Sequence, residues 1–181
     1  MGAFLVVSGL PATGKTTVAS SLAQALSLPH FDKDTYLEAL FAKYGRVDPI
    51  TRNALSAKAD EQFQFAAEAS SAVVLSSWWK HSASKRDSGT PTAWLSARPR
   101  VIEVHCVSTP ATAARRFLDR RRHASHCDDR WSYDSLLTML EEQEPFGPLF
   151  PSKCLIVNTE HGIDLHEVLP QVKARLSFGH A

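Results

Sequence analysis

The glycine-rich octapeptide from Gly9 to Thr16 constrains the fold of this chain more than any other segment. It reads Gly-Leu-Pro-Ala-Thr-Gly-Lys-Thr and fits the pattern G-x-x-x-x-G-K-[ST], whose glycines let the backbone curl with its N–H groups pointing inwards. An apolar run at residues 3–8, typical of a buried strand, precedes it, and residues 15–26 follow with apolar positions at helical spacing. A strand, such a loop and a helix N-terminus together form a site for phosphate anions.

This octapeptide is the Walker A pattern, and it predicts ATP and Mg²⁺ as ligands. We expect Lys15 to reach the β- and γ-phosphates as a catalytic residue, and the Thr16 hydroxyl to bind Mg²⁺. The residues predicted to bind the nucleotide at this loop are Gly9, Leu10, Pro11, Ala12, Thr13, Gly14, Lys15, Thr16 and Thr17.

Short apolar runs alternate with longer helical patterns along the rest of the chain. Further strands are expected at residues 28–31, 72–75, 101–106 and 155–157, and further helices at 35–43, 50–70, 110–123, 133–144 and 165–176. The last helix is expected to be interrupted near Pro170, and the long connection at 76–99 to be a functional or mobile loop. The alternation predicts an α/β fold with a five-stranded parallel sheet covered by helices on both faces.

Length and composition favour a single domain over residues 1–181. Basic residues number 20 and acidic residues 19, so the overall charge gives no reason to expect a nucleic acid or an anionic membrane as partner. The first apolar run is too short for a signal peptide or a membrane span, which favours the cytoplasm. Three widely spaced cysteines, Cys106, Cys127 and Cys154, are expected to be reduced thiols.

The segment Phe-Asp-Lys-Asp at residues 31–34, together with the octapeptide, resembles the small P-loop kinases that phosphorylate metabolites and antibiotics. Gluconate kinase, adenylylsulfate kinase and chloramphenicol phosphotransferase are examples, and their segment reads Leu-Asp-Gly-Asp. The resemblance implies that Asp34 is the general base and that Asp32 holds Mg²⁺ through water. Lys33 stands where the pattern has glycine, which leaves the backbone path open. The alternatives are that Asp32 is the base, or that Asp34 only caps a helix beginning at Thr35.

A second resemblance lies in the arginine-rich segment at residues 114–123. It is similar to the lid of the gluconate kinase group, in which arginines four residues apart precede a histidine, here Arg116, Arg120 and His123. Residues four apart share a helix face, so Arg116 and Arg120 could converge on one anion, as catalytic residues of a lid spanning about 109–130. Arg116 is also expected to contact the nucleotide. The alternative is an ordinary solvated basic face.

Weaker signals follow the third and fifth strands. Asn158 and Thr159 are predicted to meet the adenine ring, as in the related kinases, with an ordinary turn as the alternative. The pair Trp78 and Trp79 could stack on the acceptor or belong to the core. Arg86 is more readily interpreted as a solvated arginine than as an acceptor ligand. No acidic residue ends the third strand, which argues against a motor or a switch-type GTPase.

These patterns together predict a P-loop NTPase fold of the nucleoside-monophosphate-kinase kind with an arginine-rich lid. The predicted activity is transfer of the γ-phosphoryl group from ATP to a hydroxyl group of a small molecule. The alternatives are a polynucleotide 5′-hydroxyl kinase, with tryptophans stacking on bases, and a nucleotide-binding switch without transfer activity. The identity of the acceptor, the choice between ATP and GTP, and the oligomeric state stay open.

Overall fold

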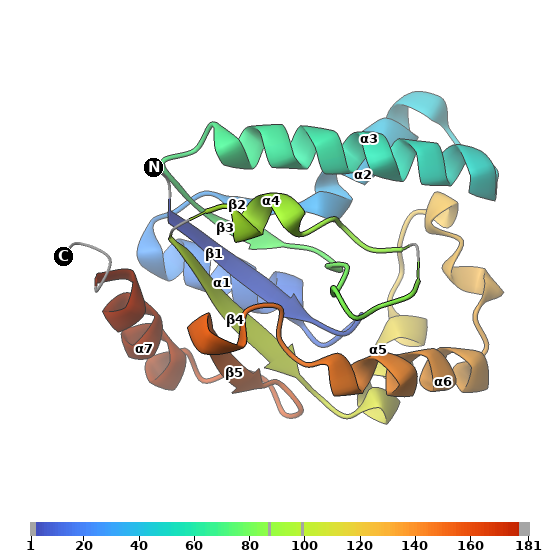
Figure 1. Ribbon diagram of the computed structural model, residues 1–181. Helices are drawn as coiled ribbons and strands as arrows, with labels where there is room; N and C mark the ends of the chain where they lie inside the picture. The colour runs from blue at the N-terminus through green and yellow to red at the C-terminus, as the bar shows by residue number, and fades with distance from the viewer. Residues whose placement is uncertain (1–2, 87, 99, 178–181) are drawn as a thin grey trace.

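A parallel sheet forms the centre of the computed structural model, which describes residues 3–86, 88–98 and 100–177 (Figure 1). Within these ranges the sheet has five strands in the order β2-β3-β1-β4-β5. The strands are β1 (Ala3–Gly9), β2 (His30–Asp32), β3 (Ala72–Ser76), β4 (Val101–Val107) and β5 (Cys154–Asn158). All neighbouring pairs are parallel, which confirms the predicted sheet.

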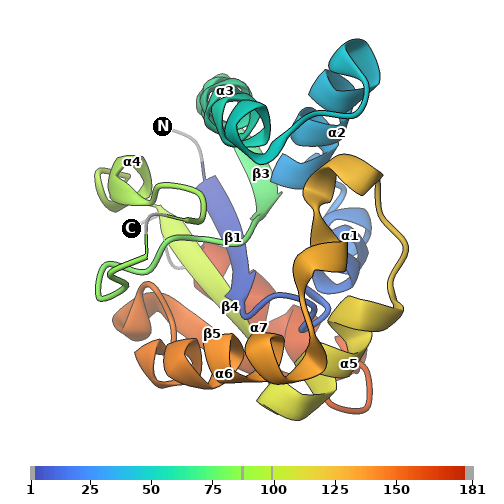
Figure 2. The same ribbon diagram turned by 90° about the vertical axis from the view of Figure 1, so that its right-hand side faces the viewer.

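Helices cover both faces of the sheet. On one face lie α1 (Lys15–Leu26) and α7 (Leu165–Ser177), and on the other lie α3 (Pro49–Glu68) and the short α4 (Ala93–Ser96). Helix α2 (Lys33–Tyr44) packs on α3. Helices α5 (Pro110–Asp119) and α6 (Tyr133–Gln143) lie across the carboxyl ends of the strands, as Figure 2 shows from that end. Short 3₁₀ turns complete the described chain: η1 (Ala124–His126), η2 (Asp128–Arg130), η3 (Glu144–Phe146) and η4 (Pro151–Lys153).

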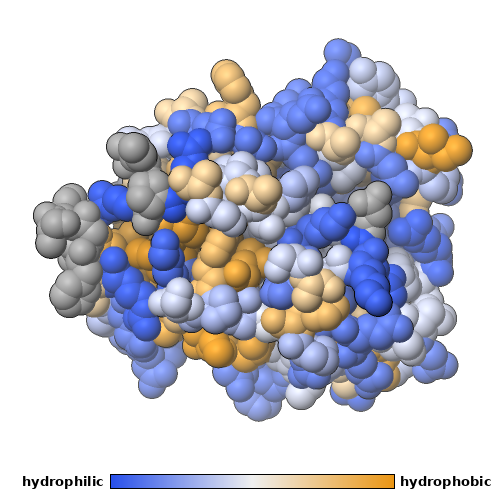
Figure 3. Space-filling view, in the orientation of Figure 1, coloured by the Kyte–Doolittle hydropathy of each residue, from blue (hydrophilic) through white to orange (hydrophobic). Residues whose placement is uncertain are grey.

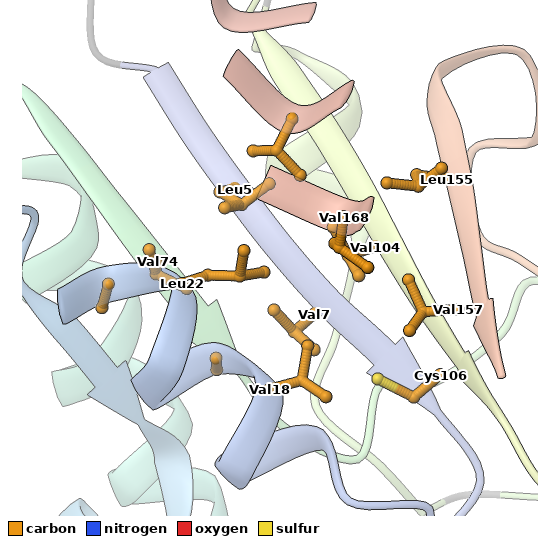
Figure 4. Close-up of a cluster of buried hydrophobic side chains, with 13 residues drawn as sticks. Leu5, Val7, Val18, Leu22, Val74, Val104, Cys106, Leu155, Val157 and Val168 are labelled. Atoms are coloured by element: carbon orange, nitrogen blue, oxygen red, sulfur yellow. The ribbon is translucent and has the colours of Figure 1, made fainter. Parts of the chain in front are cut away.

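The central strand β1 is buried on both faces because its side chains alternate between two hydrophobic clusters. Leu5 and Val7 pack with residues of α1 and α7, as the close-up of that cluster shows (Figure 4). Phe4 and Val6 pack instead with residues of α3 and α4. Burying both faces fixes the register of β1, and with it the point at which the glycine-rich loop leaves the sheet.

Two predicted helix boundaries and one predicted interruption were wrong. Helix α2 begins at Lys33 rather than Thr35, because Asp32, not Asp34, caps it by accepting a hydrogen bond from the Asp34 N–H. Helix α5 ends at Asp119, short of residue 123, and Arg120 is already extended. Helix α7 runs through Pro170 without interruption, since Val168 and Val172 on either side are both buried in the core.

The described ranges also bear on two expectations about the whole molecule. Cys106, Cys127 and Cys154 are free thiols, as expected. No helix among the described residues combines the length and the apolar composition that crossing a membrane requires.

Candidate active site

The glycine-rich loop turns sharply at its first glycine. Gly9 ends β1 beside Cys106 of β4 and has a φ of +131°. A Cβ atom there would lie 2.3 Å from the Cys106 carbonyl oxygen, a separation that real atoms do not tolerate. The loop closes on itself as Thr13 donates from its hydroxyl to the Leu10 carbonyl at 2.8 Å. Position 9 therefore requires glycine for both its space and its dihedral angle.

The N-terminus of α1 presents an uncapped anion site to this loop. Gly14 is its N-cap in a left-handed conformation, with a φ of 85°, and no side chain among the described residues caps it. The first N–H groups of the helix, those of Lys15, Thr16 and Thr17, have no intrahelical partner and add the positive end of the helix dipole. Pro11 has no N–H to contribute. The loop thus has the donors that a polyphosphate chain needs.

Lys15 lies inside the loop rather than in solvent. Its side chain donates to the Leu10 carbonyl at 2.7 Å, and only 9% of the residue is exposed. Burial lowers the pKa of Lys15 from 10.5 to about 8. A buried ammonium whose main partner is a carbonyl gains strongly from an anion placed in the cradle, because a charged partner offsets its desolvation.

The metal-binding pair predicted from the sequence meets in the structure. The Thr16 hydroxyl donates to Oδ2 of Asp32 at 2.7 Å, which joins the first turn of α1 to the end of β2. The hydroxyl of Ser76, at the end of β3, donates to the same carboxylate at 2.9 Å. A hydroxyl and a carboxylate oxygen are hard ligands of the kind that Mg²⁺ takes, with waters completing its coordination. These two residues therefore fit the ion.

Asp34 lies two residues after Asp32, in the first turn of α2, and contacts the arginine-rich segment. Its carboxylate accepts a hydrogen bond from Arg122, and its side chain is 49% exposed. Burial alone raises the pKa of Asp34, but the charges of Arg122, His126, Lys33 and Arg120 outweigh it and hold this pKa below its ordinary value. Asp34 is therefore ionised at neutral pH and its carboxylate is engaged by a cation.

The arginines of the predicted lid do not converge on one point. Arg116 donates to the carbonyls of Thr159 and Glu160, at 3.0 and 2.8 Å. Arg120 has left the helix and approaches Asp128 at 3.5 Å, so the expected helical pairing of Arg116 with Arg120 is wrong in this structure. Arg122, which the four-residue spacing does not select, reaches Asp34. The cause is the early end of α5, which rotates residues 120–123 away from the helix face.

The end of β5 and the residue that follows it were predicted to meet the nucleotide, and Thr159 borders the loop. The Thr159 hydroxyl donates to the Thr13 carbonyl at 2.7 Å, and Thr159 is 3% exposed. The Asn158 side chain accepts from the Glu160 N–H at 2.8 Å in a local turn, the alternative left open by the sequence. Thr159 therefore lies beside both the phosphate loop and Arg116.

The two adjacent tryptophans lie in different surroundings. Trp79 is 5% exposed, packs with Phe63 and donates from its indole N–H to the Val7 carbonyl, so it belongs to the core and has no free face for a nucleobase. Trp78 packs against a hydrophobic cluster of α5 and α6, as do Leu10 and Ala12 of the loop. Arg86 pairs with Glu142 at 2.7 Å in an exposed ion pair.

Sequence reasoning missed a polar network that connects α2, α3 and the end of β3. Buried Lys33 donates to Ser56 and lies 3.9 Å from Asp60, whose carboxylate accepts from Thr90 at 2.7 Å. Thr90 in turn bonds to Ser77 at 2.6 Å. The substitution of Lys33 for the glycine of the related segment was the signal that could have pointed to it.

Comparisons with known proteins establish the fold. No family model and no curated protein sequence matches the chain. A protein from Chloroflexus aurantiacus J-10-fl that carries a provisional kinase assignment superposes with a TM-score of 0.76 at 24% identity, covering 98% of this chain and 97% of its own. Shikimate kinase from Bacteroides thetaiotaomicron superposes with a TM-score of 0.60 at 18% identity, covering 97% of this chain and 98% of its own. A gluconokinase from Sinorhizobium meliloti 1021 superposes with a TM-score of 0.53 at 20% identity, covering 98% of this chain and 92% of its own. The chain has the P-loop fold of the small kinases of the shikimate and gluconate kinase type.

Proposed function

We propose that this protein is an ATP-dependent kinase that transfers the γ-phosphoryl group to a hydroxyl group of a small molecule. The observation that carries the proposal is the hydrogen bond between Thr16 and Asp32, with Asp34 two residues further along the chain. It supports the proposal because the phosphate loop, the two residues proposed to bind Mg²⁺ and the proposed base then share one edge of the sheet. The solved structures that share this fold include kinases of shikimate and gluconate, by their names.

The loop would hold the phosphates of ATP through its backbone N–H groups and through Lys15. Thr16 and Asp32 would hold Mg²⁺, which neutralises phosphate charge when bound. Lys15 leaves the Leu10 carbonyl for the phosphates, and this exchange places its positive charge on the oxygens where negative charge spreads during transfer.

Asp34 is the proposed general base. Its low pKa keeps it ionised, so it can accept the proton of an attacking hydroxyl once Arg122 has moved aside. Its half-exposed carboxylate lets an acceptor approach from solvent.

Residues 109–130 form the proposed lid. Arg122 and Arg120 share Asp128 as a partner, at 3.5 Å each, so both can be redirected by a small shift of one segment. Closing over bound ATP would bring their charge to the transferring group and exclude water. Arg116 would remain by the nucleotide, against the segment after β5.

An ATP-consumption screen over sugars, nucleosides, amino alcohols and hydroxylated antibiotics tests the proposal. We expect at least one class to stimulate ATP turnover. The change Asp34→Asn should then lower kcat by roughly 10² or more, with the affinity for an ATP analogue nearly unchanged. Asp134→Asn, at an exposed position of α6, is the matched control and should leave kcat unchanged.

Two results would contradict the proposal. Unchanged turnover in the Asp34→Asn variant would remove Asp34 from the mechanism. ATP binding without consumption in the presence of every acceptor class would favour a nucleotide-binding switch instead.

A further inference from the structure

A cavity of about 180 Å³ lies behind the phosphate loop, on the sheet face opposite α1. Its walls come from β1, β4 and β5, from the connection that follows β3, and from the segment after α6, and they include the loop residues Gly9, Leu10 and Thr13. Lys15, Thr16, Asp32 and Asp34 are not among its lining residues in the described part of the chain. This space is therefore separate from the Mg²⁺ pair and the candidate base.

A buried hydrogen-bond relay fixes one wall of this cavity. Glu103 is 0% exposed and accepts from the backbone N–H groups of Leu149 and Phe150, at 2.9 and 2.7 Å. It also accepts from the Ser8 hydroxyl. Burial alone raises the pKa of Glu103, but these hydrogen bonds, with that of His105, outweigh it and lower the pKa, so Glu103 is a carboxylate.

The relay determines which nitrogen of His105 carries the ring hydrogen. Nδ1 of His105 lies 2.7 Å from the Ser8 oxygen. The single hydroxyl proton of Ser8 goes to Glu103, because a carboxylate only accepts, so the hydrogen on this contact comes from Nδ1. In the neutral ring Nε2 is then an acceptor, and within the described ranges it has no hydrogen-bond partner.

A second polar atom of the cavity lacks a partner as well. Ser108 lines the cavity, and its buried hydroxyl oxygen has no hydrogen-bond partner among the described residues. Buried polar atoms are normally satisfied, so the unpaired Ser108 hydroxyl indicates a ligand with a matching group, and His105, which lines the same cavity, offers such a ligand an acceptor nitrogen. None of the described lining residues is Lys or Arg, so the cavity offers nothing to balance an anion.

The remaining walls suit a flat ring. His81 and Phe146 stack with ring centroids 5.4 Å apart and planes at 12°, and Trp78 also lines the space. Ile156 on β5 is 61% exposed, so the cavity opens at this edge, where Figure 3 shows apolar surface over β4 and β5. A cavity of about 150 Å³ lined by apolar side chains is known to hold benzene, so this volume fits one substituted ring.

We propose that this cavity is a second small-molecule site, which binds a neutral, planar, single-ring compound through a hydroxyl or N–H group donated to Nε2 of His105. The site is independent of the phosphoryl acceptor, and a ligand in it lies against Leu10, whose carbonyl holds Lys15.

The experiment is a ¹⁹F NMR titration of the full chain with 4-fluorophenol and with fluorobenzene, which differ only in the donor group. We expect saturable binding of one 4-fluorophenol per chain, and binding of fluorobenzene about tenfold weaker. His105→Leu should weaken 4-fluorophenol about tenfold and leave fluorobenzene unaffected, whereas His166→Leu, at an exposed position of α7, should change neither affinity. A saturating non-hydrolysable ATP analogue should leave the 4-fluorophenol stoichiometry at one.

A milder variant keeps the test valid if His105→Leu does not fold. Ser108→Ala removes only the unpaired hydroxyl and should weaken 4-fluorophenol a few-fold, with Ser152→Ala, at an exposed position, as its control. Equal affinity of the two probes for the unmodified protein, no saturation with 4-fluorophenol, or its displacement by the ATP analogue would each overturn the proposal.

Discussion

The phosphate loop and the arginine-rich segment differ in the range of their contacts. Inside the loop, the Leu10 carbonyl accepts from Thr13 and from Lys15, which is five residues away. In the arginine-rich segment, Arg116 contacts a carbonyl 43 residues away, and Arg122 contacts a carboxylate 88 residues away. The side-chain contacts of Thr13 and Lys15 are thus local, although Cys106 and Thr159 also border the loop, whereas the arginines contact only partners that the tertiary fold brings to them.

This difference predicts how each region responds to substitution. A loop that is held by local side-chain contacts and by a glycine packed against Cys106 has no alternative geometry, so changes there should abolish binding. The arginines of the other segment can exchange their partners. Substitutions there should therefore change reaction rates and their pH dependence without abolishing binding. Four substitutions, taken from the largest expected effect to the smallest, test the contrast.

Gly9→Ala should have the largest effect. The added Cβ would overlap the Cys106 carbonyl oxygen at 2.3 Å, and the dihedral angle is already unfavourable for alanine. We expect loss of ATP-analogue binding and a decrease of about 3 kcal/mol or more in the free energy of unfolding. Calorimetric titration and urea unfolding measure the two quantities.

Gly14→Ala is the matched control, since Gly14 also has a positive φ but its added Cβ would meet only the Thr159 Cβ, at 4.0 Å. The left-handed conformation alone should cost about 1 kcal/mol. Equal destabilisation by both substitutions would show that close packing at Gly9 is not what shapes the loop.

Lys15→Met should lower kcat/KM by about 10³, because it removes a charge aimed at the transferring phosphoryl group. The same change should stabilise the nucleotide-free protein. At pH 7 the lysine is charged in both the folded and unfolded states, so the folded protein carries the full cost of burying it. Its removal should raise the free energy of unfolding by about 2 kcal/mol.

The pH dependence of the unfolding free energy distinguishes this loss of a buried charge from better packing of the methionine side chain. Burial lowers the pKa of Lys15 from 10.5 to about 8 in the folded protein. Between these values the unfolded chain binds more protons, so the unfolding free energy of the unmodified protein should rise with pH relative to the Lys15→Met variant. Urea unfolding should show that the difference in unfolding free energy between the Lys15→Met variant and the unmodified protein is smaller at pH 10 than at pH 7. An equal difference at the two pH values would contradict the argument from burial.

The features that could be predicted from the sequence are the local ones, and those that could not depend on distant segments. The sheet, the cradle and the proximity of Thr16 and Asp32 were predicted, because they depend on strand order and on a local motif. The partner of Arg122 was not predicted, and the choice for Trp79 between the core and the acceptor stayed open, because each depends on packing between distant segments. The end of α5 was missed because residues 120–122 are all arginine, which helical spacing alone cannot exclude.

The contact between Thr16 and Asp32 joins the phosphate loop to the end of β2, so it belongs to both kinds of contact compared above. Thr16→Val tests it. Valine keeps the shape of the side chain but removes the oxygen proposed to bind Mg²⁺. The Mg²⁺ concentration that gives half-maximal activity should rise about tenfold. Thr17→Val, at the neighbouring helix position, should raise the KM for ATP and leave the Mg²⁺ dependence unchanged; the same Mg²⁺ shift in both variants would refute the assignment of Thr16.

Arg122→Gln should have the smallest effect at neutral pH and the most informative one in acid. Arg122 is the largest of the charges that lower the pKa of Asp34, so its loss should raise that pKa. Because a general base must be ionised, the acidic limb of the kcat/KM profile should move to higher pH, with activity at neutral pH changed less than about tenfold. Arg121→Gln, at an exposed neighbouring position, should leave the limb in place. If the limb does not move in the Arg122→Gln variant, either Asp34 is not the base or this arginine leaves it before the titrating state forms, and the lid then influences the reaction only through the bound nucleotide.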